Sequence, residues 1–62
     1  MNNLQTIREC LKMLVELVEL LEEIAKVRPK VSDEVVAMLN DAEIELFEII
    51  GREIARLEEI DP

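Results

Sequence analysis

Two carboxylates interrupt the apolar pattern in the second half of the chain. Glu53 falls near the centre of an apolar helical arc, and Glu43 falls inside one edge of it. A carboxylate buried there needs a cationic partner, because taking an ion out of water costs several kcal/mol. In an antiparallel hairpin, position 53 lies opposite position 7. We therefore predict a buried ion pair between Arg8 and Glu53, with Arg56 as the second candidate partner.

This pair is expected to fix the register of the fold and not to catalyse a reaction. Structural ion pairs also occur outside active sites, and a tuned catalytic acid needs a second titratable group of another kind nearby. Cys10, the single cysteine, has no histidine to act as its base, because the chain contains none. We expect no enzyme activity and no catalytic residues.

The sequence also predicts no metal and no cofactor. Without His, and with one Cys, the usual zinc, haem and iron–sulfur ligand sets cannot be assembled. The run Glu16-x-x-Glu19-x-x-Glu22-Glu23 does place carboxylates one turn apart, as a Mg²⁺ or Ca²⁺ site requires. The same spacing is common on any acidic helix that faces water, and we favour that interpretation.

Two long helices must position these residues. The apolar periodicity predicts a first helix over about residues 3–27, begun by Asn2 or Asn3 as a cap and stopped by Pro29. A second helix is predicted over about residues 33–60, with Ser32 as its cap. Gly51 costs that helix about 1 kcal/mol relative to Ala and should cause a kink at most. The loop of residues 28–32 is short enough to force an antiparallel hairpin, so we expect an all-α fold with one domain over residues 1–62.

Neither helix can cover the apolar surface of the other. The apolar arcs span about 160° and 180° of the two helices, whereas one neighbouring helix covers a narrower seam. At 62 residues the chain buries only about 60% of its unfolded surface, and one cysteine allows no disulfide within it. We therefore predict a homo-oligomeric four-helix bundle, most simply a dimer of hairpins. Its predicted core contains Leu4, Ile7, Leu11, Leu14, Leu17, Val18, Leu21, Ile24, Val35, Leu39, Ala42, Leu46, Ile49, Ile50, Leu57 and Ile60.

The charge is acidic and unevenly distributed. The net charge is −8, with −1 on residues 1–28 and −8 on residues 31–62, and Lys30 between them. Such a surface repels phosphate groups, so we expect neither nucleic acid nor an anionic membrane as a partner. A basic protein remains as a candidate partner beside a second copy of the chain. The unpaired Cys10 is typical of a reducing compartment, and we expect a cytoplasmic protein.

The expected architecture resembles the Rop family of plasmid-copy-number regulators, which are helical hairpins that dimerise into four-helix bundles. The segment Leu39-Asn40-Asp41, followed by Glu45-Leu46-Phe47, carries the resemblance. That family binds RNA through basic and aromatic residues of its first helix. This chain has Glu9, Glu16 and Glu23 there and no aromatic residue, so RNA binding is not carried over.

Residues 32–47 are also similar to the sporulation aspartyl-phosphate phosphatases, which are small helical hairpins with a five-residue signature. That signature reads Ser-Gln-Glu-Leu-Asp, and this chain reads Leu39-Asn40-Asp41-Ala42-Glu43, with no identical position. The resemblance implies a phosphatase in which Asp41 or Glu43 is exposed. Our leading hypothesis is a non-enzymatic, oligomeric interaction or regulatory module, such as a small inhibitor or adaptor from a mobile element or virus. The phosphatase-like regulator and an engineered bundle without biological activity are the alternatives.

Overall fold

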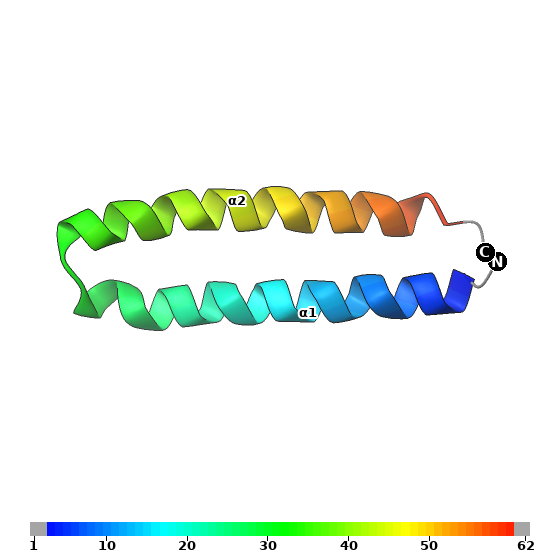
Figure 1. Ribbon diagram of the computed structural model, residues 1–62, viewed down its shortest axis with the longest axis horizontal. Helices are drawn as coiled ribbons and strands as arrows, with labels where there is room; N and C mark the ends of the chain where they lie inside the picture. Colours follow the sequence, from blue (N-terminus) through cyan, green and yellow to red (C-terminus); the bar gives the residue numbers. More distant parts are fainter. Residues whose placement is uncertain (1–2, 61–62) are drawn as a thin grey trace.

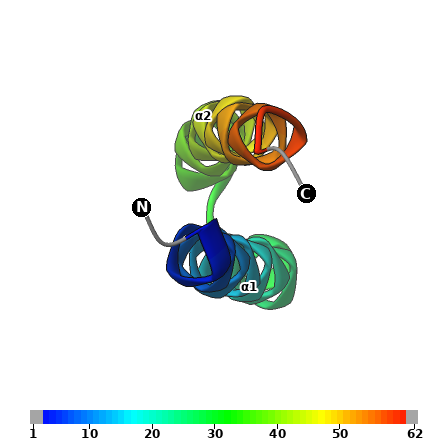
Figure 2. The ribbon, with the colours of Figure 1, turned by 90° about the vertical axis from the view of Figure 1, so that its right-hand side faces the viewer.

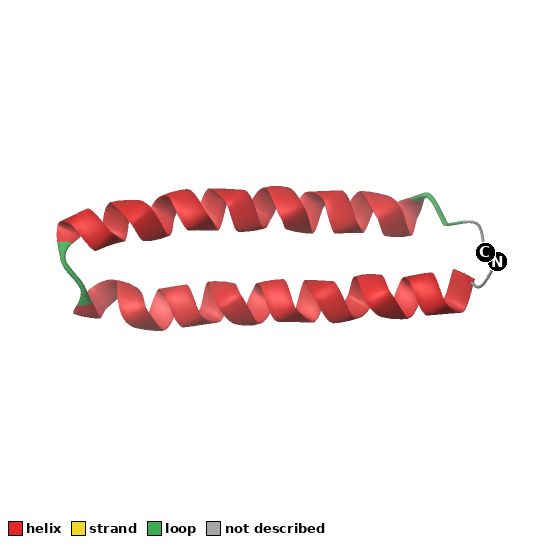
Figure 3. Cartoon of the chain, viewed as in Figure 1, coloured by secondary structure: helices red, strands yellow, loops and turns green. Residues whose placement is uncertain are grey.

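The computed structural model describes residues 3–60 and consists of two long helices lying antiparallel, with no strand in that range (Figures 1 and 3). Helix α1 spans Asn3–Val27, the short 3-10 helix η1 spans Arg28–Lys30, and α2 spans Asp33–Glu58. The predicted helical hairpin is therefore confirmed. Of the two predicted caps of the first helix, Asn2 lies outside the described residues and Asn3 is the first residue of α1.

The turn between the helices follows local signals in the sequence. Pro29 lies within η1, where its missing N–H is not needed. Ser32 caps α2 as predicted, because its hydroxyl accepts a hydrogen bond from the backbone N–H of Val35 at 3.4 Å. Asp33 and Glu34 then place negative charge in the first turn of α2, where the helix dipole favours it.

Helix α2 runs without a break through Gly51 and ends two residues before the predicted boundary. Its last turn tightens at Glu59, whose backbone N–H donates to the carbonyls of Ala55 and Arg56. No atom lies within 4 Å of the place that a side chain at Gly51 would occupy, apart from the glycine's neighbours and the helix backbone. Gly51 therefore has no packing role within one chain.

The hairpin seam follows a regular alternation of three- and four-residue steps on both helices. Side chains that are buried or half-buried recur at this spacing, which is typical of coiled-coil packing. On α1 they are Ile7, Cys10, Leu14, Leu17, Leu21 and Ile24, and on α2 they are Val36, Leu39, Glu43, Leu46, Ile50, Glu53 and Leu57. Viewed end-on, the two helices are inclined to one another, as such a seam requires (Figure 2).

One chain is an elongated plate with little interior. Its Cα atoms extend over 48 × 15 × 12 Å, and their radius of gyration is 14.7 Å. A compact domain of this length has a radius of gyration of about 10.6 Å. Among the described residues only Cys10, Leu17 and Glu53 are buried. The hairpin therefore leaves both of its broad sides available for other contacts.

Candidate functional site

The most enclosed point of the hairpin is a polar cluster made by both helices. Cys10 of α1 is 1% exposed, and Glu53 of α2 is 8% exposed. The Nη1 atom of Arg56 donates to the two carboxylate oxygens of Glu53 at 3.2 and 3.3 Å. Arg56 follows Glu53 by one helical turn, so both side chains lie on the same side of α2. The buried carboxylate thus has a cationic partner from its own helix.

Cys10 is held in its neutral form at this site. Burial raises the pKa of the Cys10 thiol, and a hydrogen bond to Glu53 and the negative charge of that group raise it further. The positive charge of Arg56 opposes this effect in part. A neutral, enclosed thiol is a poor nucleophile and a poor metal ligand. The cluster is therefore suited to a structural role.

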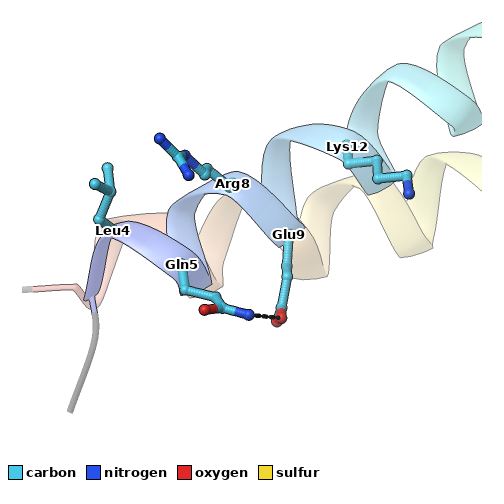
Figure 4. Close-up of a pocket in the computed structure, with 5 residues that line it drawn as sticks. All are labelled: Leu4, Gln5, Arg8, Glu9 and Lys12. Atoms are coloured by element: carbon cyan, nitrogen blue, oxygen red, sulfur yellow. Dashed lines mark hydrogen bonds between the residues drawn. The ribbon is translucent and has the colours of Figure 1, made fainter.

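The predicted pair between Arg8 and Glu53 has to be corrected, because Glu53 pairs with Arg56. Arg8 is exposed and lies on the surface of α1, where it lines a shallow hollow of about 290 Å³ with Leu4, Gln5, Glu9 and Lys12 (Figure 4). The physical reason is the helical phase. Position 8 comes one residue after Ile7 of the seam, which turns it by about 100° away from α2.

A second ion pair joins the turn to the body of α2. Arg28 of η1 pairs with Glu43 of α2, and both side chains are about two-thirds or more shielded from solvent. The sequence pattern indicated that Glu43 needs a partner, but it did not identify Arg28, which falls in the predicted loop of residues 28–32. This inter-element pair was missed.

The remaining acidic residues form no site in the part of the chain that the structure describes. Within residues 3–60, no group of three or more Cys, Asp or Glu side chains is arranged to hold a metal ion. Glu23 of the glutamate run pairs with Lys26 at 3.4 Å on the open surface. Asp41 is exposed on α2, whereas Glu43 is engaged by Arg28. Neither described helix combines the length and apolar character that a bilayer crossing requires.

The large apolar side chains that stay exposed fall on two opposite sides of the seam. In antiparallel helices, residues that follow the seam on one helix lie on the same side as those that follow it on the other. This rule groups the exposed residues into two faces. The "Phe47 face" consists of Leu4, Leu11, Val15 and Val18 of α1 with Ile44, Phe47 and Ile54 of α2. The "Leu20 face" consists of Met13, Leu20 and Val27 of α1 with Val35 and Met38 of α2.

The Phe47 face is the larger of the two and the less charged. Phe47 itself is 59% exposed, although it is the only aromatic residue of the chain. Next to it on α1 lies an open hollow of about 500 Å³, lined by Leu11, Leu14, Val15, Val18, Glu19 and Glu22. Val15 and Ile44 are not among the predicted core residues, and both belong to this surface.

The predicted core residues divide between the seam and these faces. Leu17 is buried in the seam, whereas Leu4, Leu11, Val18 and Val35 are exposed in one chain. The others are half-buried: Ile7, Leu14, Leu21, Ile24, Leu39, Ala42, Leu46, Ile49, Ile50, Leu57 and Ile60. A single hairpin therefore buries only part of the predicted core. The burial of the remaining core residues by a second hairpin stays a prediction.

Comparison with known proteins adds no assignment to this geometry. No family model, no curated protein and no solved structure matches the chain.

Proposed function

We propose that this chain is a non-enzymatic interaction module that acts as a homodimer of hairpins, that is, as an acidic four-helix bundle. One observation carries the proposal: large apolar side chains line both broad sides of the plate, and very few are buried within it. Monomeric proteins rarely expose contiguous apolar patches of more than a few hundred Å². A second hairpin gives each helix the second neighbour that its wide apolar arc requires.

The surface area of the chain supports the same proposal. One chain of 7.2 kDa exposes 5026 Å². A compact monomer of that mass exposes about 4100 Å². The excess is close to the surface of about 800 Å² that each partner buries in a stable interface of ordinary size. One broad side, 48 Å by 15 Å between Cα atoms, is large enough to supply it.

The Phe47 face is the side that suits a second copy. Its edges carry Arg8 and Glu22 on α1 and Glu58 on α2, which leaves a charge of −1. Between these groups, the edge of α2 holds Ala37, Ile44 and Gly51, which have no charge. Two copies of this face can meet with little electrostatic repulsion, and the contact buries the aromatic ring together with six aliphatic side chains.

Charge also favours one way of pairing the hairpins. Helix α2 carries eight carboxylates and two arginines, whereas α1 carries five carboxylates and three cations. A dimer in which α2 of one copy packs on α1 of the other separates the two acidic helices to the diagonal of the bundle. A two-fold axis parallel to the helices produces this arrangement and keeps all neighbouring helices antiparallel.

A matched pair of substitutions tests the proposal. Phe47→Glu places a charge in the centre of the Phe47 face, and Ala55→Glu adds the same charge to the outer side of α2. In size-exclusion chromatography with light scattering, we expect a dimer mass for the original chain and for Ala55→Glu. Phe47→Glu should give a monomer mass, because the new carboxylate would be desolvated in the interface. A dimer of unchanged stability for Phe47→Glu would exclude this face as the interface.

A further inference from the structure

We propose that the Leu20 face is a docking site for a basic amphipathic helix of another protein. This inference rests in part on the proposed function, because a dimer formed through the Phe47 face leaves the Leu20 face turned outward on each hairpin. The proposed occupant is a third helix that lies along the seam and presents its own apolar side inward.

The apolar part of the Leu20 face is long and continuous. On α1, Met13, Leu20 and Val27 recur every seven residues, so they form a straight line down the helix. On α2, Val35 and Met38 are exposed, and the half-buried Ala42 and Ile49 continue the surface toward the middle of the helix. Met38 is 68% exposed, the largest fraction of any large apolar side chain described. Flexible Met side chains are common where a surface receives a partner helix.

Carboxylates border this surface on both helices. Glu9, Glu16 and Glu23 follow the apolar line of α1 at the same seven-residue interval, so they form one edge with a spacing of about 10 Å. The opposite edge, on α2, holds Glu45, Arg52 and Glu59. Arg56 also lies on this side, but its charge is matched by Glu53. The formal charge of the edges is −4, or −3 when the pairing of Glu23 with Lys26 is counted, compared with −1 for the Phe47 face.

This distribution of charge decides which occupant fits. A second copy on the Leu20 face would bring an edge charge of −4 against another −4, which disfavours self-association there. A helix with Leu or Met on one side and Lys or Arg on its flanks would place its cations opposite the glutamates instead. Because Arg52 and Arg56 lie toward the C-terminal end of α2 and Lys26 pairs with Glu23, the strongest attraction is expected beside Glu16.

The experiment uses a defined probe and the full chain. The probe is a fluorescently labelled 18-residue peptide, with Leu at helical i, i+3, i+4 and i+7 spacing and Lys elsewhere. A counterpart with Glu in place of Lys is the peptide control. Affinity is measured by fluorescence anisotropy for the original chain and for two triple variants that change the net charge equally. Glu9→Gln, Glu16→Gln and Glu23→Gln remove one edge, whereas Glu19→Gln, Asp41→Asn and Glu48→Gln remove carboxylates from the outer sides of the helices.

We expect the Lys peptide to bind and the Glu peptide not to bind. The edge triple variant should bind the Lys peptide about tenfold more weakly, and the outer triple variant less than about twofold more weakly. Leu20→Gln should weaken binding, and Ala55→Gln, on the outer side of α2, should not. Equal losses for the two triple variants would overturn the proposal in favour of general attraction to an acidic protein. Equal losses for Leu20→Gln and Ala55→Gln would overturn it as well.

Sedimentation of the same samples, with and without the peptide, distinguishes a failure of the docking site from a failure of the homodimer. It gives the mass of the protein in each case. A monomer that keeps the expected order of peptide affinities would contradict the homodimer and leave the docking site standing. A dimer that binds neither peptide would contradict the docking site and leave the homodimer standing.

Discussion

Cys10 of α1 and Glu53 of α2 meet across the hairpin in its most enclosed region, and a hydrogen bond joins the thiol to the carboxylate. Arg56 donates to both oxygens of the same carboxylate. One glutamate thus satisfies a polar group from each helix, although the surrounding positions are apolar. A shift of one residue along either helix would separate the Cys10 thiol from Glu53, whereas Arg56 would stay beside Glu53 because both lie on α2. The contact therefore favours a single register of the two helices.

The stability of the fold should fall at alkaline pH because of Cys10. Burial raises the pKa of the Cys10 thiol in the folded chain, so the unfolded chain releases this proton at a lower pH. The stabilisation is complete below the ordinary thiol pKa of about 8.5 and declines as pH rises from there toward the folded pKa. Urea unfolding between about pH 7 and 10 should show this decline. Cys10→Ala should lose less stability over that range, and an identical decline in both proteins would contradict the assignment.

Removing Arg56 should destabilise the chain more than removing Arg8 does. Arg56→Ala leaves the carboxylate of Glu53 buried without its cation, and we expect the free energy of unfolding to fall by about 1–2 kcal/mol. The loss is modest because the Arg56 side chain is 54% exposed. Arg52→Ala and Arg8→Ala remove exposed charges and should change the free energy of unfolding by less than about 0.5 kcal/mol. A larger effect at Arg8 than at Arg56 would restore the pair that the sequence predicted.

The pair between Arg28 and Glu43 should be coupled energetically. A double-mutant cycle with Arg28→Ala and Glu43→Ala should give a coupling free energy of about 1 kcal/mol, because both groups are partly shielded from water. The exposed pair of Lys26 and Glu23 is the matched control, with an expected coupling below about 0.5 kcal/mol. Equal coupling free energies in the two cycles would show that the partial burial of Arg28 and Glu43 does not strengthen their interaction.

Gly51→Ala should stabilise α2. The helix is regular at Gly51, and the site of the new side chain is open within one chain. Alanine should therefore increase the free energy of unfolding by up to about 1 kcal/mol, seen as a higher thermal midpoint. A loss of stability instead would indicate that another helix approaches Gly51 closely in the assembled protein.

The helices could be predicted from the sequence because their signals are local. Pro29 and Ser32 mark the turn, and the apolar periodicity on either side of them specifies two helices whatever surrounds them. The seam could not be predicted in the same way. Both helices carry apolar residues on each side of it, so the hydrophobic pattern placed Leu11 in the predicted core together with Leu17. The structure leaves Leu11 exposed and buries Leu17 and Cys10 in the seam.

The ionic contacts were predicted only in part, for a related reason. That Glu53 and Glu43 need partners followed from the apolar pattern, which is a property of one helix. Which cation each receives depends on helical phase and on the path of the turn. The phase turns Arg8 outward and leaves Arg56 beside Glu53, and η1 brings Arg28 within reach of Glu43.

Sedimentation equilibrium of the original chain at micromolar concentration tests the central claim most directly. We expect the mass of two chains, because the excess surface of one hairpin matches the area that a stable partner covers. The thermal midpoint of the same samples should rise with protein concentration, as mass action requires when folding and association are coupled. A mass of one chain, with a thermal midpoint independent of concentration, would contradict the homodimer.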